Sequence, residues 1–265
     1  MHLNGALLAT RFSRMFYSFA LLTIVLLATA TPAAATNLEL AFAFGIGGLT
    51  QDEGHGVAVD DSDNLYITGY FERVVDFDPG PGIANMMAVG PYNYMDQFVL
   101  KLDADGEFVW ATSMGTVGLE TGRAMVVDSD GYVYTAGSVV QKLNPNGQVL
   151  WSRSMGEEGY DIAVDASGNV YTTGSFSGTL DFDPGLGTFE MTSSGRTDIF
   201  VSKLDSNGNF VWAKAMGGTL DDAGKGIALD SSNNDTRPAS FGRRSTSTQV
   251  SEPPREPVRG MKTYS

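Results

Sequence analysis

The sequence predicts an all-β fold: an incomplete β-propeller of about three four-stranded blades, with an orphan strand before them and a disordered tail after them. Two groups of residues recur three times at fixed spacing, which is typical of repeat architectures. The 265 residues include 32 glycines and 10 prolines, so turns are frequent. There is no cysteine, so packing and hydrogen bonds must hold the fold without disulfides.

Residues 1–35 have the pattern of a signal peptide. Arg11 and Arg14 precede an uncharged apolar stretch from 15 to 30, and small residues follow at Ala33 and Ala35. The stretch is shorter than the roughly 20 residues of a membrane-spanning helix, which favours cleavage after Ala35 over an uncleaved anchor. We therefore expect export to the extracellular space, the cell surface or the periplasm, with no membrane span after cleavage.

The repeats occupy residues 36–230 and contain two motifs. In the first, an aspartate is followed by a tyrosine and then a glycine at the same offsets in every unit. These residues are Asp60, Tyr66 and Gly69; Asp128, Tyr134 and Gly137; and Asp165, Tyr171 and Gly174. In the second, lysine, glycine, tryptophan, methionine and glycine share their spacing. These residues are Lys101, Gly106, Trp110, Met114 and Gly115, with matching sets from Lys142 to Gly156 and from Lys203 to Gly217.

Each unit contains four short segments rich in β-branched and aromatic residues, separated by turns that contain aspartate, asparagine and glycine. Tandem four-stranded units predict propeller blades, whereas a β-sandwich does not require the same residues at fixed offsets in each unit. The expected blades span about 56–115, 124–156 and 161–217, and a fourth starts at 225–230.

The two ends of the repeat region are incomplete. Residues 39–45 are predicted to be an orphan strand, because Phe42 and Ile46 match Trp212 and Met216 in position. After Asp230 the repeat gives way to a basic segment, 231–265. Ordering its 35 residues would cost on the order of 50 kcal/mol, which its few apolar side chains do not offset, so we expect disorder. A frameshift or truncation, or a natural basic tail, would each explain it.

The third unit contains three longer motifs: Gly-Asn-Val-Tyr-Thr-Thr-Gly from 168, Asp-Phe-Asp-Pro-Gly from 181, and Phe-Val-Ser-Lys-Leu-Asp from 200. Together they resemble the bacterial SBBP repeat, a family of seven-bladed β-propellers. The resemblance implies an exported or cell-surface propeller and assigns no activity. The second unit lacks the Asp-Phe-Asp-Pro-Gly insertion, and the blade count is below seven.

The carboxylates of the insertions are candidate metal ligands. They alternate along extended chain before a Pro-Gly turn and so lie on one side of it. The candidates are Asp76, Asp78, Asp181 and Asp183. Calcium prefers six to eight oxygen ligands, so each pair could begin a structural calcium site. Aspartates also initiate turns, and this structural interpretation is favoured because only two ligands are visible.

Catalytic residues are scarce in the repeats. Of the two histidines, His2 lies in the leader, and His55 is matched by Arg123, Tyr160 and Lys225, which suggests a solvated loop position. No Ser-His-Asp or Cys-His arrangement is expected. The repeated tryptophans and lysines are expected to pack between blades and to cover apolar surface, and we expect no cofactor other than structural calcium.

The sequence therefore predicts a noncatalytic exported module that binds or scaffolds an extracellular protein or glycan. The net charge of −14 disfavours nucleic acid as a partner. Two alternatives remain: a fragment of an exported propeller enzyme whose site lies on missing blades, and a nonfunctional truncated remnant. Open blade faces would favour self-association.

Overall fold

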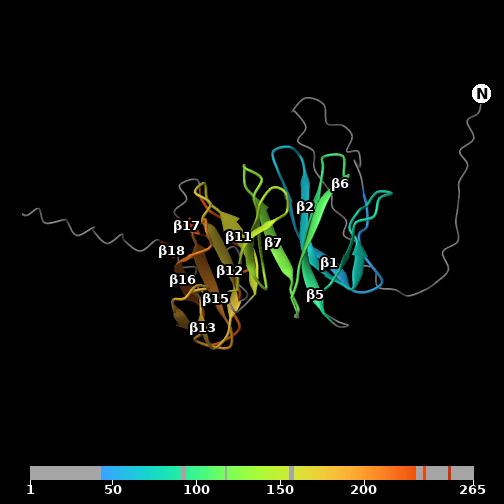
Figure 1. The fold of residues 1–265 in the computed structure, drawn as a ribbon. Coiled ribbons are helices and arrows are strands. Elements are labelled where there is room, and N and C mark those ends of the chain that lie inside the picture. Colours follow the sequence, from blue (N-terminus) through green and yellow to red (C-terminus); the bar gives the residue numbers. More distant parts are fainter. Residues whose placement is uncertain are drawn as a thin grey trace, which may run out of the picture.

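The computed structural model describes residues 43–90, 94–116, 118–154 and 158–230, together with the backbone of 235–236 and 250–251. Every regular element in this part of the chain is a β-strand, which confirms the predicted fold class. Three antiparallel four-stranded sheets form three blades (Figure 1). The described residues contain no helix long and apolar enough to cross a membrane.

Blade 1 has the strand order β1-β2-β5-β6. Its strands are β1 (Asp52–Val59), β2 (Leu65–Glu72), β5 (Met95–Leu102) and β6 (Phe108–Met114). A two-stranded hairpin is inserted between β2 and β5 and consists of β3 (Val74–Asp76) and β4 (Asn85–Met87).

Blade 2 is the simplest of the three, because its four strands follow one another without an insertion. They are β7 (Gly122–Val127), β8 (Val133–Gly137), β9 (Val140–Leu143) and β10 (Val149–Arg153). Blade 3 repeats the plan of blade 1. It contains β11 (Gly159–Val164), β12 (Val170–Phe176), β15 (Asp198–Leu204) and β16 (Phe210–Met216), with the inserted hairpin β13 (Thr179–Asp181) and β14 (Glu190–Thr192).

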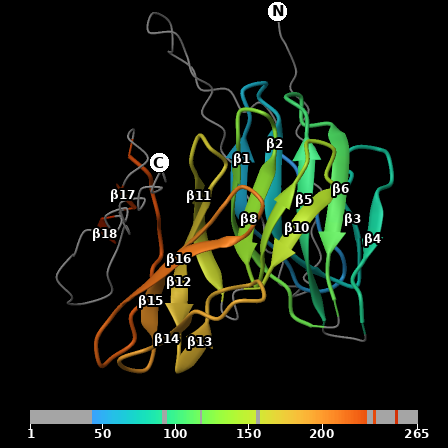
Figure 2. The ribbon, with the colours of Figure 1, turned by 60° about the vertical axis from the view of Figure 1, so that its left-hand side comes forward.

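The blades are arranged side by side (Figure 2). Their first strands are neighbours, because β1 contacts β7 and β7 contacts β11. Apolar side chains fill the space between the sheets. Tyr66 and Val99 of blade 1 pack with Val133 and Leu143 of blade 2. Burial of these sheet faces supplies most of the stabilisation, because each sheet alone would leave two apolar faces in water.

The repeated aspartate and tyrosine form one unit of structure in every blade. The Asp165 carboxylate accepts hydrogen bonds from the backbone amides of Ser167 and Asn169, and it also accepts one from the Tyr171 hydroxyl at 3.2 Å. The equivalent bonds from tyrosine to aspartate, Tyr66 to Asp60 and Tyr134 to Asp128, are each 3.0 Å long. The offset of six residues between aspartate and tyrosine is fixed because the tyrosine hydroxyl donates a hydrogen bond to the aspartate of the turn that precedes its strand.

The ends of the repeat region lie on the outer faces of blades 1 and 3. Phe44 and Ile46 pack on the core of blade 1, and Ile227 is buried against Tyr171 and Val201 of blade 3. Residues 43–45 of the predicted orphan strand have no strand assignment, and 39–42 lie outside the described residues. So do residues 1–35 and most of the tail, where only β17 (Asp235–Thr236) and β18 (Val250–Ser251) are described as a pair.

Candidate functional site

A β-bulge occurs at the same place in each first strand. Pairing shifts register between Gly54 and Gly56 in β1, and likewise across Arg123 in β7 and Tyr160 in β11. The extra residues are therefore His55, Arg123 and Tyr160. Bulges redirect a side chain away from the regular alternation of a strand, so these three residues share a distinct position on the innermost strands.

The repeated glycine of the second strand makes room for the bulge. A Cβ atom on Gly69 or Gly137 would lie 1.8 Å from the carbonyl oxygen of Glu53 or Thr121, and one on Gly174 would lie 2.3 Å from that of Glu158. Atoms cannot approach so closely, so the bulge requires glycine at this position. The glycine at a fixed offset in each unit therefore permits the bulge, and the bulge sets the direction of the His55, Arg123 and Tyr160 side chains.

His55 corrects a prediction from the sequence. It lies on strand β1 with a side-chain exposure of 18%, not in a solvated loop. Its Nε2 atom lies 2.9 Å from Glu53 Oε2, and its ring meets the Tyr70 ring edge to face. Within the described part of the chain, its buried Nδ1 atom has no hydrogen-bond partner. Neither ring nitrogen contacts a serine or threonine hydroxyl among the described residues.

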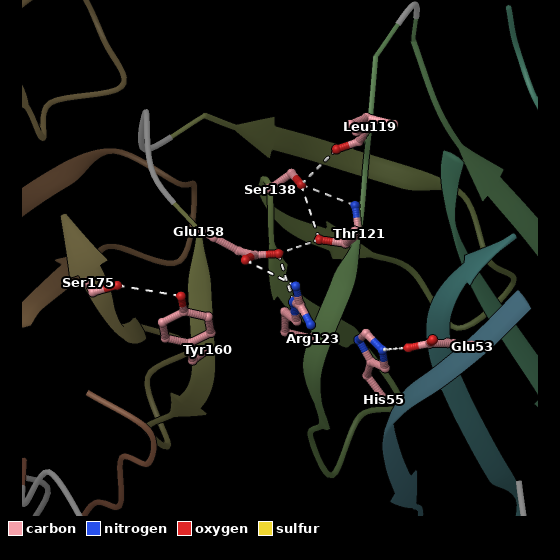
Figure 3. Close-up of polar contacts among 9 residues, drawn as sticks. All are labelled: Glu53, His55, Leu119, Thr121, Arg123, Ser138, Glu158, Tyr160 and Ser175. Atoms are coloured by element: carbon pink, nitrogen blue, oxygen red, sulfur yellow. Dashed lines mark hydrogen bonds and ion pairs between the residues drawn. The ribbon is translucent and has the colours of Figure 1, made fainter. Parts of the chain in front are cut away.

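Glu158 joins blades 2 and 3 across the bulges (Figure 3). Its carboxylate accepts hydrogen bonds from Arg123 Nε at 2.7 Å and from the Thr121 hydroxyl. Burial opposes ionisation of Glu158, but these two donors outweigh it and lower the pKa of the carboxyl group. The network continues from Thr121 to Ser138, whose hydroxyl donates to the Leu119 carbonyl oxygen.

We expect Arg123→Met to destabilise the fold by about 1–2 kcal/mol, because it leaves the half-buried Glu158 carboxylate without its cation. The ordinary pKa of glutamic acid is 4.5, and that of Glu158 is lower in the folded chain. Its contribution is therefore fully present above pH 4.5 and is lost as the pH falls through the folded-state pKa. Urea unfolding at about pH 7 and about pH 3 measures this.

The control is Arg123→Met combined with Glu158→Gln, which removes both charges. This variant should recover part of the loss at neutral pH and should lack the corresponding acid dependence. Equal stability of the wild type and Arg123→Met at neutral pH would contradict the role given to the pair.

A groove of about 540 Å³ lies beside this network, between the outer parts of blades 1 and 2. Its wall is mixed. The polar residues are Ser113, Glu120, Ser138, Gln141, Ser152 and Ser154, and the apolar ones include Met114, Leu119, Val139 and Val149. In blade 2 only Ser138 and Val139 connect β8 to β9. In blades 1 and 3 a two-stranded hairpin is inserted at the equivalent place. The groove therefore adjoins the blade without an insertion.

Two groove side chains present acceptors that no described residue contacts with a donor. Gln141 is only 6% exposed, and its amide nitrogen lies 3.3 Å from the Ser152 hydroxyl, but its Oε1 atom has no hydrogen-bond partner. The Oε2 atom of Glu120 is also buried and without a partner. By strand register, Gln141 occupies the position that Leu100 fills in the core of blade 1. An acceptor in a core position costs stability unless a donor reaches it.

The four aspartates predicted as calcium ligands lie in the inserted hairpins. Asp76 and Asp181 are the last residues of β3 and β13, and Asp78 and Asp183 follow them in the connecting turns. Asp181 Oδ1 accepts hydrogen bonds from the backbone amides of Asp183 and Phe189, at 3.0 and 2.8 Å. These donors lower the Asp181 pKa. Asp76 Oδ1 is held in the same way by the amides of Asp78 and Ala84. Among the described residues, no three acidic or histidine side chains gather as a metal site.

The geometry supports a structural role for these aspartates, and a melting experiment can decide whether they also bind calcium. Because the turn amides already occupy one oxygen of Asp76 and of Asp181, we expect added calcium to leave the thermal midpoint unchanged. Differential scanning calorimetry in about 5 mM EDTA and in about 5 mM calcium chloride compares the two states. A rise of several degrees with calcium would contradict this expectation and establish a site.

The repeated tryptophans and lysines contribute to packing. The indole nitrogens of Trp110 and Trp151 donate to the carbonyl oxygens of Pro145 and Ser206, each in the next blade. The ammonium group of each repeated lysine lies over a tyrosine ring of its own blade. The distances to the ring centre are 4.9 Å for Lys101 and Tyr66, 5.0 Å for Lys142 and Tyr134, and 4.8 Å for Lys203 and Tyr171.

Comparison with known proteins agrees with this architecture. Residues 44–70 match the family model described as SBBP, beta-propeller repeat. An uncharacterized WD repeat-containing protein, L264 of Acanthamoeba polyphaga mimivirus, is 21% identical over 253 aligned positions. The alignment covers 74% of this chain and 18% of that protein, so the chain spans under a fifth of the relative it matches.

Among solved structures, a protein of unknown function from Bacteroides caccae aligns with 62% of this chain and 82% of its own, at 14% identity and a TM-score of 0.28. The motifs, the three four-stranded blades and the family match give one assignment. The chain is a β-propeller repeat protein that carries the SBBP repeat.

Proposed function

We propose that this chain is a noncatalytic binding module that acts outside the cytoplasm and holds a neutral glycan in the groove between blades 1 and 2. The observation that carries the proposal is the Oε1 atom of Gln141, a buried acceptor in the groove wall that no donor among the described residues reaches. Export is supported by the leader pattern of residues 1–35.

The chemistry of the groove favours a polyhydroxyl ligand. Gln141 Oε1 and Glu120 Oε2 can each accept a hydrogen bond from a ligand hydroxyl, and the serine hydroxyls can donate or accept. A volume of about 540 Å³ is in the range of small-molecule sites. The net charge of −14 disfavours anionic ligands, which leaves neutral sugars as the favoured class.

The test is titration calorimetry of the full chain with a panel of neutral oligosaccharides, followed by Gln141→Leu. Leucine is the residue of blade 1 at this position, so the sheet should tolerate it. We expect Gln141→Leu to weaken binding by about tenfold or more, because the ligand hydroxyl loses its acceptor.

The matched control is Gln148→Leu, the same change on an exposed side chain of the same blade, outside the groove wall. Gln148→Leu should bind as the wild type does. The proposal is wrong if no neutral glycan binds, or if Gln141→Leu and Gln148→Leu bind equally well. Binding of a protein ligand that Gln141→Leu leaves intact would place the function on another surface.

A further inference from the structure

The inserted hairpin of blade 1 presents a row of apolar side chains to solvent at the outer side of the blade (Figure 2). Side chains alternate along extended chain, so Ile83, Met87 and Val89 share the outward face of β4 and its flanking residues. Ile83 is 78% exposed, Met87 71% and Val89 47%. Val74 of β3, which is 48% exposed, pairs with Met87 across the hairpin. These four residues are called the apolar stripe.

The inserted hairpin of blade 3 has the same register but a polar outer face. Thr179 and Thr192 pair as Val74 and Met87 do, and their hydroxyl oxygens lie 2.8 Å apart. The four residues equivalent to the apolar stripe are Thr179, Thr188, Thr192 and Ser194. The hairpin therefore forms with polar side chains at these positions. Because single exposed apolar residues are common but contiguous patches are not, the apolar stripe has the composition of an interaction surface.

The apolar stripe is long and narrow. The chain is extended from 83 to 89, because backbone hydrogen bonds at Ala84 and Ala88 prolong the ladder of β3 and β4 at both ends. Extended chain of this length covers about 20 Å. A helix of about 13 residues has the same length. An amphipathic helix presents one narrow row of apolar side chains, so its apolar face matches the stripe in length and width.

Carboxylates surround one end of the apolar stripe. Asp76 and Asp78 belong to the same hairpin, and Glu107 lies beside its turn, since a Cβ atom on Gly80 would be 3.6 Å from Glu107 Oε2. Arg73, at the bend before β3, already has an interaction within the chain. Lysine or arginine side chains of a partner would therefore be attracted to this end. A second copy that docked through the same stripe would instead bring two sets of carboxylates together.

We infer that the apolar stripe docks a basic amphipathic helix of a partner protein. The apolar side of the helix would cover Val74, Ile83 and Met87, and its basic residues would face Asp78 and Glu107. The stripe is separate from the groove between blades 1 and 2, with whose wall it shares no residue. Because the contact is small and partly electrostatic, binding is weak and decreases as the salt concentration rises.

The test is fluorescence anisotropy of a labelled peptide of about 14 residues, titrated with the full chain. The peptide contains only leucine and lysine, with the leucines on one helical face. We expect a dissociation constant on the order of 10–100 μM at low salt, and weaker binding at physiological salt. The same peptide with glutamate in place of every lysine should bind about tenfold more weakly or less, because like charges then meet.

Ile83→Thr combined with Met87→Thr should weaken binding of the lysine peptide by about tenfold or more, because both contacts lose apolar area. Threonine is the residue of blade 3 at both positions, so the hairpin should tolerate it. Val74→Thr should weaken binding by about threefold for the same reason. Its matched control is Val211→Thr, the same change on β16 at 46% exposure, which should leave binding unchanged.

The threonine variants keep the net charge of the chain, so they separate docking on the stripe from the general attraction of a basic peptide to an acidic protein. Near-ultraviolet circular dichroism confirms that each variant is folded. The inference is overturned if the lysine peptide does not bind, if the glutamate peptide binds as well, or if the threonine variants of the stripe bind as the wild type does. It is also overturned if the wild type self-associates in sedimentation velocity and these variants do not, because a second copy then occupies the stripe.

Discussion

Replacing Phe182 by alanine is expected to destabilise the chain by about 3–5 kcal/mol, the largest effect of any substitution considered for this fold. Phe182 has no exposed surface, and its ring centre lies 5.1 Å from that of Phe176 and 5.2 Å from that of Phe200. Alanine would leave a cavity among aromatic rings that belong to a rigid sheet, so the site cannot collapse.

Thermal unfolding followed by circular dichroism measures this effect, and we expect the midpoint to fall by roughly 10 °C. The control is Leu186→Ala in the same inserted loop, where the leucine side chain is fully exposed and should be dispensable. If Phe182→Ala does not fold, Phe182→Leu retains part of the contact and should show a smaller fall. A midpoint for Phe182→Ala within about 2 °C of the wild type would contradict the proposed packing.

Gly174→Ala is expected to cost about 2–4 kcal/mol, the second large effect. The added methyl group would lie 2.3 Å from the Glu158 carbonyl oxygen, and the ring of Phe200 is also within 3 Å. The bulge across Tyr160 must therefore shift, which alters the contacts of β11 with its neighbours.

Urea unfolding measures this loss, and Gly218→Ala is the matched control in the same blade. A Cβ atom on Gly218 would meet its nearest neighbour at 3.8 Å, an ordinary contact, so we expect a change below about 1 kcal/mol. Equal stability of the two variants would show that the bulge does not depend on glycine.

Much of the fold could be predicted from the sequence because the repeats make the same contacts. Tyr171 and Asp165 keep their spacing since the tyrosine hydroxyl reaches the carboxylate of the preceding turn. Trp151 keeps its place since its indole binds the next blade. Fixed offsets therefore identify residues whose contacts lie within one blade or between consecutive blades, and these contacts define the sheets.

The candidate sites were harder to predict, because they occupy positions where the repeats differ. His55 was interpreted as a solvated loop residue since Arg123 and Tyr160 replace it elsewhere, but the backbone at this position is a bulge in every blade. Glycine at a fixed position inside a strand, as at Gly174, is the signal that could have indicated a bulge.

Two further features needed the three-dimensional arrangement. The aspartates of Asp-Phe-Asp-Pro-Gly were predicted from the sequence as candidate metal ligands. The structure shows that the phenylalanine between them, Phe77 or Phe182, is the side chain of the motif that is buried in the core. The groove depends on Gln141, a polar residue where blade 1 has the buried Leu100. A comparison of the repeat units, in search of positions where a polar residue replaces an apolar one, could have identified Gln141. It could not have shown that a groove lies beside Gln141.

Three four-stranded blades make up the described repeat region of this chain, and amide hydrogen exchange of the full chain tests this arrangement most directly. We expect slow exchange in the central strands of every blade, with fast exchange in the turns between them. These central strands are β2 and β5, β8 and β9, and β12 and β15. Fast exchange throughout one of these pairs would contradict a three-bladed structure, whereas protection in all three pairs would establish it.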